Sequence, residues 1–212
     1  MSILDLGDWL SPDREARPVL VAIAGPNGSG KTTFYENFIA PFGLPFVNAD
    51  LIAKEIAAKG GKTGDYEAAK AAERKRRELL SKKRSFCMET VFSDTVGDKR
   101  NFLRDAQKGG YGVLLIFIGL DHVETSRARV AQRVSAGGHT VPDKKIEDRF
   151  PRTIENLRKA IGFVDYAWLL DNSSFDEPFR PVAVWVAGET RQLFPPFPPW
   201  ARSVLHGPSV HR

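Results

Sequence analysis

The sequence is poor in cysteine and in long apolar runs. Its 212 residues contain one cysteine, Cys87, so no disulfide can form within the chain. The longest apolar run, Val113–Leu120, is interrupted by a glycine and is much shorter than the ~20 apolar residues of a membrane span. The segment Met1–Pro18 lacks the basic start and the apolar core of a signal peptide. We therefore expect a cytoplasmic protein without a membrane-spanning segment.

The composition is typical of a globular protein, with 42% hydrophobic and 27% charged residues. The length suits one α/β domain with a full core and leaves no room for two ordinary domains. The 31 basic residues outnumber the 26 acidic ones, which gives a net charge of +5. This excess fits a nucleic-acid partner or a pocket for anionic small molecules, and the composition does not decide between them.

Short apolar segments alternate with longer amphipathic segments along the chain. This alternation predicts a parallel sheet with helices on both faces, in which ligands bind at the carboxyl ends of the strands. We expect Asp50 and Asp65 to cap the second and third helices. The expected strands are Pro18–Ala24, Pro45–Asn48, Ser85–Glu89, Gly112–Leu120, Trp168–Leu170 and Val182–Ala187, and the expected helices are Lys31–Ile39, Leu51–Lys59, Asp65–Lys83, Asp98–Lys108, Val123–Ala136 and Asp143–Phe163.

A phosphate-binding motif follows the first expected strand. The segment Gly25–Thr32 fits G-x-x-x-x-G-K-[ST] at every fixed position, and an expected helix follows it. Its glycines let backbone N–H groups approach phosphate oxygens, Lys31 reaches the β and γ phosphates, and Thr32 offers a hydroxyl to Mg²⁺. Asn172, after a late strand, is a candidate neighbour of the adenine ring or a turn residue. The predicted residues for ATP are Gly25, Pro26, Asn27, Gly28, Ser29, Gly30, Lys31, Thr32, Thr33 and Asn172.

Acidic residues end the next strands. Asp50 is a candidate base that accepts the proton of an attacking hydroxyl, or it is only a helix cap. Glu89 occupies a Walker B position if its strand neighbours the first, and could hold Mg²⁺ or bind substrate hydroxyls. Thr90 and Ser93 extend it into a polar cluster suited to a sugar or alcohol, unless they cap a helix. Asp121 is a weaker candidate for Mg²⁺, because capping explains it fully.

Two expected helices carry arginines on either side of a Gly-Gly-His sequence. Phosphoryl transfer requires positive charge on the migrating group, and a glycine hinge lets such helices close over it. We select Arg133 and Arg149 as catalytic, the alternative being a solvated basic face. His139 is a candidate for phosphate or substrate, or a turn residue. The other basic helix, Arg74–Arg84, lacks interleaved aromatics, so nucleic acid is an unlikely partner for it.

The order of these motifs resembles the zeta toxin family of P-loop kinases. The similarity lies in GPNGSGKTT at Gly25–Thr33, VNAD at Val47–Asp50, ETVFS at Glu89–Ser93 and RVSAGGHTVP…IEDR at Arg133–Arg149. The resemblance implies an ATP-dependent kinase of UDP-N-acetylglucosamine and suggests an antitoxin protein as a partner. It implies ATP and Mg²⁺ at Lys31 and Thr32, a base at Asp50, substrate at Glu89 and Thr90, and phosphate at Arg133 and Arg149.

We therefore predict a three-layer α/β P-loop NTPase of the kinase-like kind, with a mostly parallel central sheet and a helical lid. The expected parts are an N-terminal extension (1–17), the kinase domain (18–193, lid about 123–163), and a C-terminal strap and tail (194–212) in which Phe194–Trp200 packs on the domain. A small-molecule kinase is the first hypothesis. A kinase of nucleic-acid ends and a non-catalytic ATP-dependent switch are the alternatives.

Overall fold

A seven-stranded sheet forms the centre of the computed structural model, which describes residues 17–61, 64–137 and 140–205. The strands lie in the order β2-β3-β1-β4-β5-β6-β7. The first five in this order are parallel, whereas β6 and β7 are antiparallel to their neighbours. The predicted mostly parallel sheet is therefore confirmed. The strands are β1 (Val19–Ala24), β2 (Phe46–Val47), β3 (Phe86–Thr90), β4 (Gly112–Gly119), β5 (Tyr166–Asp171), β6 (Arg180–Val186) and β7 (Glu189–Leu193).

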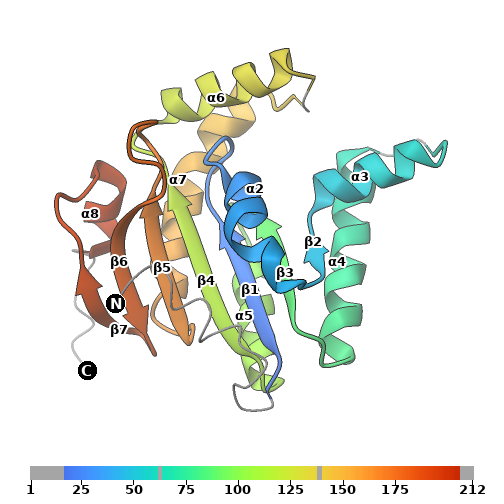
Figure 1. Cartoon of the computed structure of the whole chain (residues 1–212), viewed down its shortest axis with the longest axis horizontal. Coiled ribbons are helices and arrows are strands. Elements are labelled where there is room, and N and C mark those ends of the chain that lie inside the picture. The colour runs from blue at the N-terminus through green and yellow to red at the C-terminus, as the bar shows by residue number, and fades with distance from the viewer. Residues whose placement is uncertain (1–16, 62–63, 138–139, 206–212) are drawn as a thin grey trace.

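Helices cover both faces of this sheet (Figure 1). On one face, side chains of α4, α5, α7 and α8 form one core cluster that includes Leu20 and Ala22 of β1. On the other face, α2 and the π-helix that continues it share a second cluster with Val21 and Ile23. This alternation along β1 is the two-residue period of a buried strand. The helices are α2 (Lys31–Phe34), the π-helix Tyr35–Ile39, the 3₁₀ helix Ala40–Phe42, α3 (Ala49–Ala58), α4 (Asp65–Ser81), α5 (Asp98–Lys108), α6 (Val123–Ser135), α7 (Asp143–Ala160) and α8 (Pro199–Leu205).

The helix α6 lies across the carboxyl ends of the parallel strands (Figure 1). At that edge, α3 begins after β2 and α2 begins after β1. Residues far apart in the sequence are thus brought to one edge of the sheet, as the general rule for such sheets requires. Among the described residues, no helix is long and apolar enough to cross a membrane.

Two of the expected helix caps are wrong. The side chain of Asn48, not Asp50, caps α3, because its Oδ1 accepts hydrogen bonds from the backbone N–H groups of Asp50 and Leu51 at 2.8 and 3.3 Å. Asp50 instead lies in the first turn of the helix, where a carboxylate favourably faces the helix dipole. Gly64 occupies the N-cap position of α4, which begins at Asp65.

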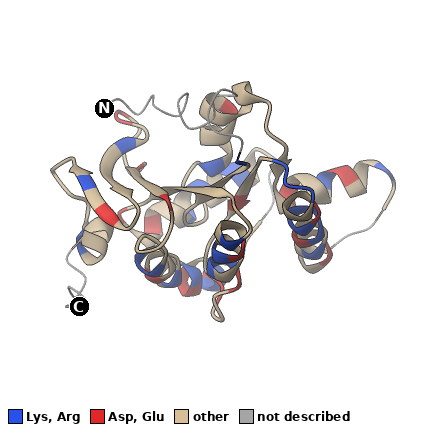
Figure 2. Ribbon diagram, turned by 90° about the horizontal axis from the view of Figure 1, so that it is seen from below, with Lys and Arg blue, Asp and Glu red and all other residues tan. Residues whose placement is uncertain are grey.

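The charged residues of α4 are arranged in ion pairs. Two pairs join residues four positions apart, with 2.9 Å between Arg77 Nε and Glu73 Oε1 and 2.7 Å between Lys82 Nζ and Glu78 Oε1. Basic and acidic residues alternate along the helices in Figure 2. The helix therefore presents a mixed solvated surface and not a continuous basic one, as the sequence analysis expects.

The end of the sheet contains two elements that the sequence analysis does not include. Strand β7 pairs with β6 through the two-residue turn Ala187-Gly188, whose φ angles of 51° and 79° are those of a type I′ hairpin. Its side chains are mostly exposed, so it lacks the apolar alternation that marks a strand. The helix α8 forms at the end of the expected strap and the start of the expected tail, because its Trp200, Ala201 and Val204 are buried in the core.

The C-terminal strap is held by Trp200. The indole is only 5% exposed, its Nε1–H donates a 2.9 Å hydrogen bond to Asp171 Oδ1, and its ring lies 5.4 Å from that of Phe117. A side chain at Gly119 on β4 would overlap this indole. The strap thus packs on the domain as expected, while the division of the chain into three parts stays a prediction.

We predict that Gly119→Ala lowers the free energy of unfolding by about 1–3 kcal/mol, because the added methyl group overfills a packed interface with Trp200. Urea denaturation followed by fluorescence measures this loss. Gly162→Ala is the matched control, since a Cβ there meets open space. Equal losses in the two variants would show that the Trp200 contact does not require a glycine.

Candidate functional site

The P-loop connects β1 to α2, as predicted. Gly25 and Gly30 have φ angles of 151° and 87°, in a region that residues with side chains rarely adopt. A Cβ at Gly25 would collide with the carbonyl oxygen of Ile118, and one at Gly30 would lie 2.6 Å from the side-chain nitrogen of Asn172. The glycines therefore serve both the backbone conformation and the close packing of the loop.

Lys31 lies in the first turn of α2 and points back into the loop. Its side chain is only 6% exposed, and its Nζ donates a 2.8 Å hydrogen bond to the carbonyl oxygen of Pro26. Burial lowers the pKa of Lys31 below its ordinary value, Glu89 and Asp50 oppose that shift, and the nearby charge of Arg133 adds to it. A phosphate at this position would favour the charged amine.

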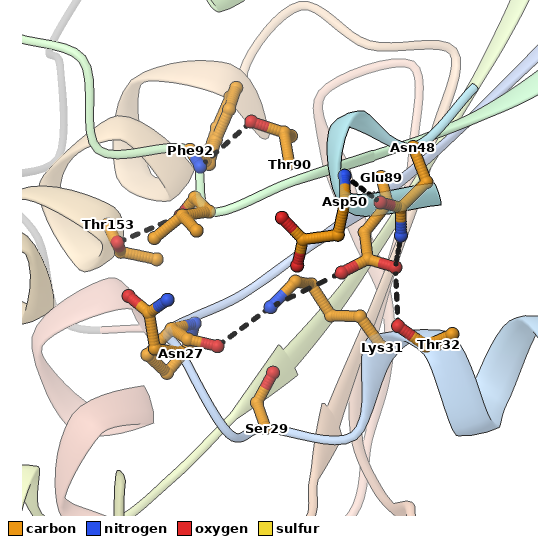
Figure 3. Close-up of polar contacts among 12 residues, drawn as sticks. Asn27, Ser29, Lys31, Thr32, Asn48, Asp50, Glu89, Thr90, Phe92 and Thr153 are labelled. Atoms are coloured by element: carbon orange, nitrogen blue, oxygen red, sulfur yellow. Dashed lines mark hydrogen bonds and ion pairs between the residues drawn. The ribbon is translucent and has the colours of Figure 1, made fainter. Parts of the chain in front are cut away.

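Glu89 lies beside the P-loop because β3 neighbours β1. Its Oε2 accepts hydrogen bonds from Thr32 Oγ1 at 2.8 Å and from Asn48 Nδ2 at 2.7 Å, and its Oε1 lies 3.9 Å from Lys31 Nζ (Figure 3). A hydroxyl and a carboxylate at one point offer the oxygen ligands that Mg²⁺ prefers. The described residues include no group of three His, Cys, Asp or Glu side chains able to hold a metal ion.

A cavity of about 210 Å³ brings together all four predicted catalytic residues, Lys31, Asp50, Arg133 and Arg149. Asp50, at the start of α3, points into the space beside the amine of Lys31 (Figure 3). Arg133 on α6 and Arg149 on α7 line the same cavity. We call this the transfer cavity; its residues include Asn27, Gly28, Lys31, Asp50, Glu89, Arg133 and Arg149.

A second cavity, of about 520 Å³, adjoins the transfer cavity and shares Asp50, Glu89 and Arg149 with it. The predicted substrate residues Thr90 and Ser93 line this acceptor-side cavity. Thr90 Oγ1 also accepts a 3.0 Å hydrogen bond from the backbone N–H of Phe92, which has a positive φ of 62°, so this hydroxyl shapes the turn after β3. The predicted residue His139 lies outside the described residues.

A third cavity, of about 300 Å³, lies on the other side of the P-loop and includes Asn172. Asn172 is buried, donates a 2.9 Å hydrogen bond to the Ser29 carbonyl oxygen, and accepts one of 3.2 Å from the Phe179 N–H. Arg129 lines this cavity too, with its guanidinium 4.6 Å from the centre of the Phe175 ring. Burial lowers the pKa of Arg129, against the opposing charges of Asp121 and Asp171.

The structure also places three further polar residues near the site, Arg129, Asp121 and Asn48. Arg129 shares a helix face with Arg133 by spacing, yet the two line different cavities on either side of the P-loop. Asp121 accepts hydrogen bonds from the His122 N–H and the Thr125 hydroxyl at 2.8 and 3.0 Å. The N-cap position of α6 is His122, so Asp121 is not the helix cap that the sequence suggests. Asn48 is a functional candidate that sequence reasoning missed, although it directly precedes the pair Ala49-Asp50 in a quoted motif.

Comparison with known proteins identifies a family. The model of the family described as Zeta toxin matches residues 6–174. An uncharacterized protein of Haemophilus influenzae is 29% identical over 126 residues, which cover 59% of this chain and 88% of that protein.

Two solved structures share the fold. A chain of the AvrRxo1-ORF1:ORF2 structure with ATP has a TM-score of 0.68 at 20% identity, covering 88% of this chain and 63% of its own length. A chain of the PezAT chromosomal toxin-antitoxin system of Streptococcus pneumoniae has a TM-score of 0.56 at 18% identity. The match covers 77% of the present chain and 72% of the PezAT chain. The present chain thus spans less than two thirds of the AvrRxo1 chain.

We predict that Asn172→Ala lowers the free energy of unfolding by about 1–3 kcal/mol, because it leaves the buried Ser29 carbonyl and Phe179 N–H groups without their partner. Thermal denaturation measures the loss. Asn101→Ala, on the exposed face of α5, is the control and should change stability little. A stability of Asn172→Ala equal to that of the control would contradict the role of this side chain as a support of the P-loop.

Proposed function

This chain belongs to the zeta toxin family, and from that membership and the site we propose that it is an ATP-dependent kinase of a small molecule. The enzyme would transfer the γ-phosphoryl group of ATP to a hydroxyl of its acceptor. The observation that carries the proposal is the transfer cavity, in which a P-loop lysine, an aspartate in the first turn of α3 and two arginines from α6 and α7 meet. A non-catalytic switch does not require this aspartate or these two arginines.

ATP would bind with its phosphates against the P-loop and its base in the cavity of Asn172 and Arg129. The amine of Lys31 would turn from the Pro26 carbonyl oxygen to the β and γ phosphates. Thr32 and Glu89 would hold Mg²⁺ at the position where their side chains now meet. When bound there, the ion supplies positive charge to the phosphate oxygens.

Asp50 would orient the acceptor hydroxyl and receive its proton. The acceptor oxygen forms a bond to the γ-phosphorus, the bond from that phosphorus to the β–γ bridging oxygen breaks, and ADP leaves. Arg133 and Arg149 stabilise the charge that spreads over the transferred group. Closure of α6 and α7 over the cavity would exclude water from the transfer.

UDP-N-acetylglucosamine, or a related sugar nucleotide, is the acceptor that we propose from the resemblance of the motifs. The polar turn at Glu89, Thr90 and Ser93, which lines the acceptor-side cavity, supports a sugar or alcohol there. We further propose a cytoplasmic location and an antitoxin protein as partner, because one similar structure is described as a toxin-antitoxin system.

The acceptor is tested with [γ-³²P]ATP and Mg²⁺ against UDP-N-acetylglucosamine, beside other sugars, nucleotides and nucleic-acid ends. We expect label on the sugar nucleotide. Label on a different acceptor would replace the proposed substrate and keep the kinase. Mg²⁺-dependent ATP binding without label on any acceptor would favour a non-catalytic switch.

We predict that Asp50→Asn lowers kcat about 100- to 10,000-fold, the usual contribution of a general base, and leaves the affinity for ATP unchanged. Transfer kinetics and calorimetric titration with ATP measure the two quantities. The control is Glu55→Gln, which removes an exposed carboxylate from the same helix. A kcat of Asp50→Asn within the range of the control would exclude the proposed base.

A further inference from the structure

The acceptor-side cavity has a cationic end that the proposed transfer does not use. Its walls carry Arg76 from α4, Lys99 from α5 and Arg152 from α7. Asp50 and Glu89 line its opposite end, where they face the P-loop. Arg76, Lys99 and Arg152 line the acceptor-side cavity but not the transfer cavity. They would therefore face the part of an acceptor that lies away from its reacting hydroxyl.

Arg76 is buried although it is charged. Its side chain is 5% exposed, and its Nη2 donates a 2.6 Å hydrogen bond to Glu73 Oε2. Its Nε is buried with no hydrogen-bond partner among the described residues, and the same is true of Arg152 Nε. Buried N–H groups without partners are costly and uncommon, so both guanidinium groups have donors available for an anion.

Glu73 holds part of this cationic end in place. One carboxylate is shared by Arg76, Arg77 and Lys99, at 2.6, 2.9 and 3.6 Å. Burial alone would raise the pKa of Glu73, but the hydrogen bond from Arg76 and the charges of Arg76, Lys99 and Arg77 hold it below its ordinary value. Arg77 is exposed and does not line the cavity, whereas Arg76, Lys99 and Arg152 line it. With Glu73 and Asp94 as the carboxylates at this end, one positive charge remains uncompensated.

Asp94 adds an acceptor group to the same end of the cavity. Both of its carboxylate oxygens are buried and have no hydrogen-bond partner among the described residues. Its backbone is fixed, because its carbonyl oxygen accepts a 2.9 Å hydrogen bond from Asn156 Nδ2. A ligand hydroxyl would satisfy this carboxylate, whereas an anionic group beside it would be repelled.

We propose that the acceptor-side cavity binds a hydroxyl-bearing oxyanion, a sugar phosphate or a sugar acid. Its anionic group contacts Arg76, Lys99 and Arg152, and one of its hydroxyls donates to Asp94. This inference rests on the proposed kinase function for the identity of the cavity as the acceptor site. Charge-assisted hydrogen bonds of arginine to phosphate or carboxylate supply the recognition.

Binding to the Mg-ADP-loaded protein tests the site without requiring transfer. Calorimetry compares N-acetylglucosamine 1-phosphate with N-acetylglucosamine, and gluconate with glucose. We expect the anionic member of at least one pair to bind about tenfold or more tightly than its neutral partner, a difference of about 1.4 kcal/mol. The pair that shows the preference distinguishes a phosphate from a carboxylate ligand.

The preference should disappear in Arg76→Gln and in Lys99→Gln, the second being less buried and thus safer for folding. Arg77→Gln is the matched control, because Arg77 contacts the same Glu73 but is 67% exposed and does not line the cavity. The absence of any preference in the wild type, or its survival in both test variants, overturns the proposal. A preserved preference without phosphoryl transfer would instead reject the kinase function and keep the anion site.

Discussion

The hydrogen bonds received by Glu89 hold the candidate site together. One carboxylate oxygen, at the end of β3, accepts from Thr32 on α2 and from Asn48 at the start of α3. The end of β3, the start of α2 and the start of α3 are therefore joined at this one carboxylate. The same Asn48 caps α3 through its side-chain oxygen, so the position of Asp50 depends on the Glu89 carboxylate at the end of β3.

Around this point, the sheet separates the functions of the site. The nucleotide phosphates would occupy the loop after β1, and the adenine ring would lie in the cavity beside Asn172. The acceptor would bind in the cavity beyond β3. The transfer cavity lies between them and is the place where α6 and α7 contribute their arginines. The ion pair between Arg127 and Glu147 joins those two helices, which would let them move over the cavity as one unit.

Sequence reasoning was most successful where residues carry a strong local signal. The P-loop, the mostly parallel sheet and the gathering of Lys31, Asp50, Glu89, Arg133 and Arg149 follow from motif spacing and strand ends. The pairing of β3 with β1, on which the place of Glu89 depends, is left open by the sequence. Arg76 and Asp94 could not be recognised, because their importance comes from burial and missing partners, which are tertiary properties. Strand β7 was missed since its side chains are largely exposed.

The central claim is that Thr32 and Glu89 form the metal position beside the P-loop. A crystal structure with Mn²⁺ and a non-hydrolysable ATP analogue tests it most directly, because the anomalous signal locates the metal. We predict that Thr32 Oγ1 leaves Glu89 and coordinates the ion, with Glu89 facing it directly or through water and Asp50 facing the γ-phosphate. A metal held away from Thr32, or a triphosphate outside the P-loop, would contradict it.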